Sequence, residues 1–144
     1  MSTALKDKIQ RVYDEAYNKG NLDILDDIVA LEYKRYQPPM NTFQGLERYK
    51  QFIQDVRQAY AGFAMKVEDI LADGDVTAVR IVLSGKHVGQ LPTLQAPPTG
   101  KQIEMQACSV IYWKDGKMVE EYAYNDYLGL IQQFGQIPPP GLYY

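Results

Sequence analysis

One carboxylate near the end of the chain, Asp126, lies where its side chain could transfer protons. If the alternation of the preceding strand is strict, every second side chain shares one face, namely Met118, Glu120, Tyr122, Tyr124 and Asp126. If that face lines a pocket, apolar surroundings would raise the pKa of the Asp126 carboxyl toward a value suited to general acid or base catalysis. The alternative is structural, because Asp126 precedes a helix predicted to begin at Tyr127 and could be its N-cap.

The only histidine of the chain, His87, is the second candidate for chemistry. It shares an alternating face with Val79, Ile81 and Leu83, in a segment rich in β-branched residues. A histidine on an apolar face is either a hydrogen-bonded core residue or a functional group. In the functional interpretation, His87 would orient Asp126 or donate a proton to an oxyanion.

Tyrosine is unusually frequent, with twelve Tyr against four Phe and one Trp. The ring is apolar, but its hydroxyl needs a partner when buried, which suits a pocket, an interface or a core. We interpret the tyrosines as a group first as core residues. The side chains predicted to line a pocket, if one exists, are four tyrosines and two adaptable methionines: Tyr36, Tyr49, Met65, Met105, Tyr122 and Tyr124.

Composition excludes several other classes of protein. One cysteine, Cys108, rules out an intrachain disulfide framework, and one cysteine with one histidine cannot form the usual zinc site, so no metal is predicted. The net charge is −3 and the basic residues form no tract, so we expect no nucleic-acid partner. No apolar run approaches the ~20 residues that span a bilayer. The first residues also lack the apolar core of a signal peptide, so we expect no membrane contact and a cytoplasmic location.

These candidates must be positioned by helices in the first part of the chain and strands in the second. The predicted elements are, in order, helices over 5–17, 22–29 and 46–60, strands over 32–37, 63–67, 76–87, 103–113 and 118–125, and a helix over 127–134. Helices followed by a hairpin meander predict an α+β fold, with a curved and mostly antiparallel sheet around the helices. We expect one domain over residues 1–135 and a Pro-rich tail over 136–144.

Several short motifs occur in a specific order. They are KGNLD (19–23), DGDV (73–76), GKHVG (85–89), PPTGK (97–101), DGKMVEE (115–121) and DYLGL (126–130). With this ordered set the chain resembles the SnoaL-like polyketide cyclase family, within the group of folds similar to nuclear transport factor 2. The resemblance covers about residues 5–135.

The resemblance implies a cone-shaped α+β barrel with an apolar pocket, assembled as a homodimer or homotetramer. It also implies a reaction without a metal or organic cofactor, in which a carboxylate of the closing segment is the general acid or base. By motif position that carboxylate is Asp126, with His87 as its polar companion. The chain departs from the family pattern at Tyr36, Lys86 and Tyr122, which bears on the substrate more than on the fold.

We therefore expect a cyclase-type enzyme acting on a small hydrophobic carbonyl compound, by intramolecular aldol cyclisation or a related isomerisation or dehydration. One alternative is a non-catalytic protein of the same fold that binds a hydrophobic small molecule. A third interpretation is an interaction protein whose sheet surface pairs with itself or with another chain.

Overall fold

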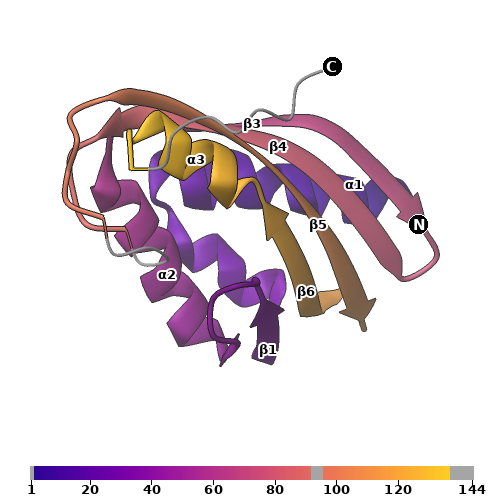
Figure 1. Ribbon diagram of the computed structural model, residues 1–144. Helices are drawn as coiled ribbons and strands as arrows, with labels where there is room; N and C mark the ends of the chain where they lie inside the picture. The colour runs from indigo at the N-terminus through magenta and orange to yellow at the C-terminus, as the bar shows by residue number, and fades with distance from the viewer. Residues whose placement is uncertain (1, 92–95, 137–144) are drawn as a thin grey trace, which may run out of the picture.

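The computed structural model describes residues 2–91 and 96–136. Three helical segments open the chain, and the strands form one curved sheet that wraps around the N-terminal helices (Figure 1). The α+β class predicted from the order of helices and strands is confirmed. The domain boundary predicted at residue 135 stays a prediction, and the predicted Pro-rich tail lies, apart from Gln136, outside the described residues.

The elements agree closely with those predicted from hydrophobic periodicity. They are α1 (Ser2–Arg11), η1 (Val12–Tyr17), η2 (Leu22–Asp27), β1 (Val29–Tyr36), β2 (Phe43–Gln44), α2 (Leu46–Ala59), β3 (Tyr60–Asp73), β4 (Val76–His87), β5 (Gln102–Lys114), β6 (Lys117–Asn125) and α3 (Tyr127–Gln133). The largest difference is β3, which extends well beyond the predicted strand at both ends.

The first helix changes its geometry halfway along. After α1 the chain continues into the π-helical turn η1, and Gly20, with a φ of 77°, then breaks the helix as predicted. The rings of Tyr13 and Tyr17, both buried, stack with their centroids 5.1 Å apart. π-helical turns are rare and occur frequently at functional sites. The N-terminal helix therefore presents two tyrosines to the interior.

The six strands are arranged in the order β2-β1-β6-β5-β4-β3. All neighbouring strands run antiparallel except β1 and β6, which are parallel. The predicted mostly antiparallel sheet is therefore confirmed. With β2 and β3 at its two edges, the sheet is curved but does not close into a complete barrel.

The concave face of the sheet is apolar and forms one core with the helices. Every second residue from Thr77 to His87 on β4, and from Ile103 to Trp113 on β5, is buried. The Trp113 indole N–H donates to Thr77 Oγ1 at 2.8 Å, so this buried polar pair is satisfied. Each fully buried large aliphatic side chain stabilises the fold by about 1.5–3 kcal/mol. This face holds the sheet against the helices.

A bulge in β6 changes which side chains point inward. Met118 pairs with Trp113, but Glu120 pairs with the residue before Trp113, so Val119 is the extra residue. One inserted residue moves every later side chain of a strand to the other face. Glu121 is consequently buried, whereas Glu120 is only half-buried. The common face predicted for Met118, Glu120, Tyr122, Tyr124 and Asp126 is wrong for this reason.

Candidate active site

Asp126 lies immediately before α3 and caps that helix. Its Oδ1 accepts a hydrogen bond from the backbone N–H of Gly129 at 2.9 Å, and the residue is exposed. A Cβ at position 129 would lie so close to the Asp126 carboxylate that this side chain would have to move. The structural alternative considered for Asp126 is therefore observed, and its catalytic role stays a prediction.

His87 is fully buried at the end of β4, as its alternation with apolar residues predicted. Its ring stacks on Phe134 with the centroids 4.3 Å apart, and its Nδ1 accepts a hydrogen bond from the backbone N–H of Thr99 at 3.2 Å. Burial lowers the pKa of His87, while the Gly89 backbone acts in the opposite direction. The imidazole is thus neutral at pH 7, with its proton on Nε2.

The structure does not bring Asp126 and His87 together. Phe134, which stacks on His87, follows the last turn of α3, whereas Asp126 precedes the first turn. A helix rises about 1.5 Å per residue, so the segment from Asp126 to Phe134 spans about 12 Å. No hydrogen bond joins the two side chains within the described part of the chain. A direct pair of the kind predicted from the family is therefore not formed.

Three of the predicted pocket tyrosines lie on the convex side of the sheet. Tyr36 and Tyr122 are cross-strand partners whose rings stack with centroids 4.6 Å apart, and Tyr124 is 59% exposed. Tyr36 alternates with Tyr33 and Arg35, which are both buried, so it points the other way. The bulge in β6 turns Tyr122 and Tyr124 outward in the same manner. Their predicted place in the interior wall is wrong.

The other three predicted lining residues face the interior. Tyr49 is 1% exposed, and its hydroxyl lies 3.1 Å from the hydroxyl of Tyr17. Met105 is buried on β5, and Met65 is half-buried on β3 and packs against the core. Contact of these three side chains with a substrate stays a prediction.

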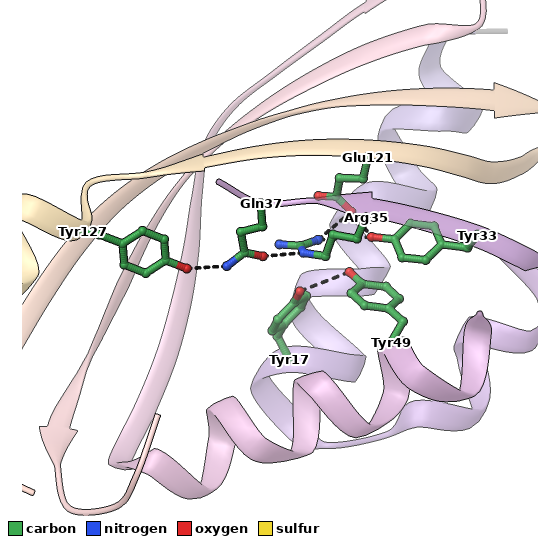
Figure 2. A network of polar contacts seen from close by, with 7 residues as sticks. All are labelled: Tyr17, Tyr33, Arg35, Gln37, Tyr49, Glu121 and Tyr127. Atoms are coloured by element: carbon green, nitrogen blue, oxygen red, sulfur yellow. Dashed lines mark hydrogen bonds and ion pairs between the residues drawn. The ribbon is translucent and has the colours of Figure 1, made fainter. Parts of the chain in front are cut away.

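An ion pair that the sequence analysis did not single out lies inside the core, between Arg35 of β1 and Glu121 of β6. Arg35 Nη1 is 2.9 Å from Glu121 Oε1, and the two side chains are 7% and 1% exposed. The Tyr33 hydroxyl donates to the same Oε1 at 2.6 Å and accepts from Arg35 Nη1 at 3.1 Å. The guanidinium carbon also lies 5.5 Å and 5.1 Å from the ring centres of Tyr49 and Phe52. Figure 2 shows the ion pair together with Tyr33 and Tyr49.

The network continues from the ion pair to the start of α3 (Figure 2). Arg35 Nε donates to Gln37 Oε1 at 2.6 Å, and Gln37 Nε2 donates to the hydroxyl of Tyr127. Asn125 Nδ2 donates to the same hydroxyl at 2.9 Å. Arginine has no acceptor, so the Gln37 amide must turn its oxygen toward Arg35 and its nitrogen toward Tyr127. Tyr127 is thereby connected to the ion pair through a single side chain.

The buried groups keep defined protonation states. Burial tends to lower the pKa of Arg35, but the Glu121 carboxylate and the neighbouring tyrosines outweigh it, and the pKa is well above its ordinary value. Burial also raises the pKa of Tyr33 and Tyr49 well above the usual range, with Glu121 adding to the effect. At neutral pH the interior therefore presents a guanidinium beside hydroxyls that remain protonated.

The sequence contains weak signals for this network. Tyr33, Arg35 and Gln37 follow each other with period two, and one member of the pair Glu120 and Glu121 must face inward. Neither signal shows whether these side chains point into the core or toward solvent. Their orientation depends on the bulge in β6 and on the pairing of β1 with β6, which are tertiary features.

One side of Glu121 is closed by apolar packing. The gap between this carboxylate and α1 leaves no room for a water molecule, and its walls are Ile9, Val12, Tyr13, Tyr49, Ile111 and Met118. On the side of α1, the described residues therefore leave no space for a ligand beside Glu121.

Within residues 2–91 and 96–136, no group of three or more His, Cys, Asp or Glu could hold a metal ion. In those same ranges, no helix is both long enough and apolar enough to cross a membrane. The chemistry that the interior side chains themselves offer is proton transfer and hydrogen bonding to oxygen.

Comparisons with known proteins agree on one family. The model of the family described as SnoaL-like polyketide cyclase matches residues 7–134. Aklanonic acid methyl ester cyclase DnrD of Streptomyces peucetius is 28% identical over 142 residues, covering 94% of this chain and 93% of the relative.

Solved structures share the fold. TsrD from Streptomyces laurentii has a TM-score of 0.83 at 23% identity, covering 94% of this chain and 97% of its own. IdmH from Streptomyces antibioticus has a TM-score of 0.75 at 26% identity, covering 91% and 98%. The curved-sheet architecture expected from the resemblance is thus confirmed, and relatives named as cyclases support a cyclase-type role. Because the family model spans nearly the whole sequence, the chain belongs to the SnoaL-like polyketide cyclase family.

Proposed function

We propose that the chain is a cyclase-type enzyme that carries out cofactor-independent acid–base chemistry on a small hydrophobic carbonyl compound, with intramolecular aldol closure as the leading case. The observation that carries this proposal is the ion pair of Arg35 and Glu121 inside the apolar core. Buried charges are costly to a fold and are concentrated at functional sites. Among the described residues, Glu121 is the only buried carboxylate.

Glu121 is the proposed base. Arg35 and Tyr33 both contact Oε1, and within the described residues Oε2 has no hydrogen-bond donor. The carboxylate would take a proton from a carbon next to a carbonyl group. The enolate carbon would then form a bond to a second carbonyl carbon of the same molecule. The proton held by Glu121 would pass to the new alkoxide, so the product is an isomer of the substrate.

The surroundings of the pair suit an apolar substrate. Phe52 and Met105 are buried on the same side of the sheet, and Tyr49 presents its ring to Arg35. Ligand sites are typically apolar with a few placed polar groups, which fix the orientation of the ligand. In the proposed site those polar groups are Arg35, Glu121 and the tyrosine hydroxyls.

The second candidate is a non-catalytic protein of the same fold that binds a hydrophobic small molecule. One observation favours it: Asp126 caps its helix. In this case the ion pair would only hold β1 against β6.

A measurement of turnover distinguishes the cyclase-type enzyme from the non-catalytic binding protein. The purified chain would be incubated with aklanonic acid methyl ester, which is named in the relatives DnrD and AcmA, and the ring-closed isomer would be quantified by chromatography against a protein-free control. We expect closure above the control, and a loss of about 10²–10⁴-fold in Glu121→Gln, the usual effect of removing a general base. Closure no faster than the control, together with binding of the ester in equilibrium dialysis, would favour the binding protein.

Two further variants sharpen this experiment. Glu120→Gln is the matched control, because the neighbouring carboxylate contacts the Tyr122 hydroxyl outside the core. Asp126→Asn decides between the two candidate bases, because asparagine caps a helix as well as aspartate and only the charge is lost. A loss of turnover in Asp126→Asn, with Glu121→Gln still active, would assign the base to Asp126.

A further inference from the structure

Arg35 has hydrogen-bond donors that the interior network does not use. A guanidinium carries five N–H groups in a rigid plane. Nε donates to Gln37, and Nη1 contacts both Glu121 and Tyr33. Among the described residues, Nη2 has no acceptor. One edge of a buried, charged guanidinium is therefore available to a ligand oxygen.

Tyr127 has an unused donor as well. Its oxygen accepts one hydrogen bond from Gln37 Nε2 and another from Asn125 Nδ2. Both bonds go to the oxygen, so the hydroxyl proton has no acceptor within the described part of the chain. Tyr127 is 8% exposed, and a buried donor without a partner costs about 1–3 kcal/mol. Accepting two hydrogen bonds also polarises the O–H group and strengthens it as a donor.

Gln37 links these two donors and keeps them on one side of β1. Its amide oxygen is held by Arg35 and its amide nitrogen by Tyr127, so the amide lies between them, as Figure 2 shows. The α1 side of Glu121 is closed, so a ligand of this site would have to meet the carboxylate from another side. Prearranged donors in a site that excludes water stabilise a negatively charged oxygen more than a neutral carbonyl.

From these contacts we propose that Arg35 Nη2 and the Tyr127 hydroxyl form an oxyanion subsite, which binds phenolate or enolate oxygens in preference to neutral ones. A ligand of this subsite would be an apolar compound with an ionisable enol or phenol. The role of this subsite in catalysis rests on the proposed function, because the Glu121 base would generate an enolate. The binding preference itself does not depend on turnover.

A pair of small probes tests this preference. para-Nitrophenol is coloured and largely ionised slightly above neutral pH, and nitrobenzene has the same ring without the ionisable oxygen. The dissociation constants of both for the full chain would be measured, by absorbance for the phenol and by calorimetry for nitrobenzene. We expect para-nitrophenolate to bind at least about tenfold more tightly, the usual effect of a hydrogen bond to a charged group.

Two variants assign the preference to the subsite. Tyr127→Phe removes only the hydroxyl, and we expect it to weaken phenolate binding about tenfold with little effect on nitrobenzene. Gln37→Glu replaces the N–H donor beside Tyr127 by a carboxylate, which captures the hydroxyl proton, and we expect the same loss. Tyr124→Phe is the matched control, because this hydroxyl lies on the convex face and the residue is 59% exposed.

The inference is overturned if the wild-type chain binds neither probe, binds both equally, or keeps its phenolate preference in both Tyr127→Phe and Gln37→Glu. A phenolate preference without any cyclase turnover would overturn the proposed function alone. Turnover without the preference would overturn the oxyanion subsite alone.

Discussion

Arg35 and Glu121 form an ion pair inside an apolar core. Gln37 accepts a hydrogen bond from Arg35, and the Tyr33 hydroxyl accepts from Arg35 and donates to Glu121. Removing one member of such a pair leaves an uncompensated buried charge, which is more costly than losing the attraction alone. The sequence places both residues on strands, but neither residue type nor spacing shows that they meet.

The first prediction concerns the stability of this pair. Arg35→Met leaves Glu121 buried without its partner, and we expect it to lower the free energy of unfolding by about 3–5 kcal/mol in urea titrations. The double variant Arg35→Met/Glu121→Leu should cost much less than the two single changes added together. Additive effects would show that the two charges do not interact in the folded chain.

The second prediction concerns the buried imidazole. The pKa of His87 is lowered by burial in the folded chain, so the unfolded chain binds more protons as the pH falls through about 6.5. The free energy of unfolding should therefore decrease from about pH 7.5 to about pH 5.5. His87→Asn, which keeps an acceptor for the Thr99 N–H, should show a shallower decrease in parallel urea titrations. Equal slopes would contradict a neutral, buried histidine.

At the level of helices and strands, periodicity was sufficient to predict α2, β4 and β5. Periodicity also predicts the short helix after Gly20, which the structure shows as a 3-10 helix. The bulge at Val119 was not predictable, because the residues around it alternate plausibly in either register. That single inserted residue exchanged Tyr122 for Glu121 on the inward face.

The third prediction concerns the start of α3. Asp126→Ala removes the cap on Gly129 N–H, and we expect the free energy of unfolding to fall by about 1 kcal/mol. Asp126→Asn should change it little, because asparagine caps equally well. Gly129→Ala should also destabilise, since the added Cβ collides with the cap. Thermal unfolding of the three variants would show this order, and an unaffected Asp126→Ala would contradict a stabilising cap.

At the level of the whole molecule, the ordered motifs predicted the family and the curved α+β sheet, and both are confirmed. The candidate site was predicted less well, because the polar groups of the interior are assembled from β1, β6 and α3. The pattern of apolar and polar residues predicts which side chains of a strand share a face, but it does not predict which strands become neighbours.

The fourth prediction concerns assembly. The homodimer or homotetramer implied by the resemblance stays a prediction, and the convex face offers the exposed aromatic side chains Tyr112 and Tyr124. Light scattering after size exclusion should give at least twice the 16.4 kDa of one chain. Tyr112→Asp with Tyr124→Asp should shift the mass toward the monomer. A wild-type monomer would contradict the expected assembly.

Glu121 as the catalytic base is tested most directly by the rate of ring closure in Glu121→Gln beside its neighbour Glu120→Gln, with circular dichroism confirming that both are folded. We expect Glu121→Gln to lose about 10²–10⁴-fold in turnover and Glu120→Gln to keep the wild-type rate. A folded Glu121→Gln that closes the ring at the wild-type rate would contradict this role of Glu121.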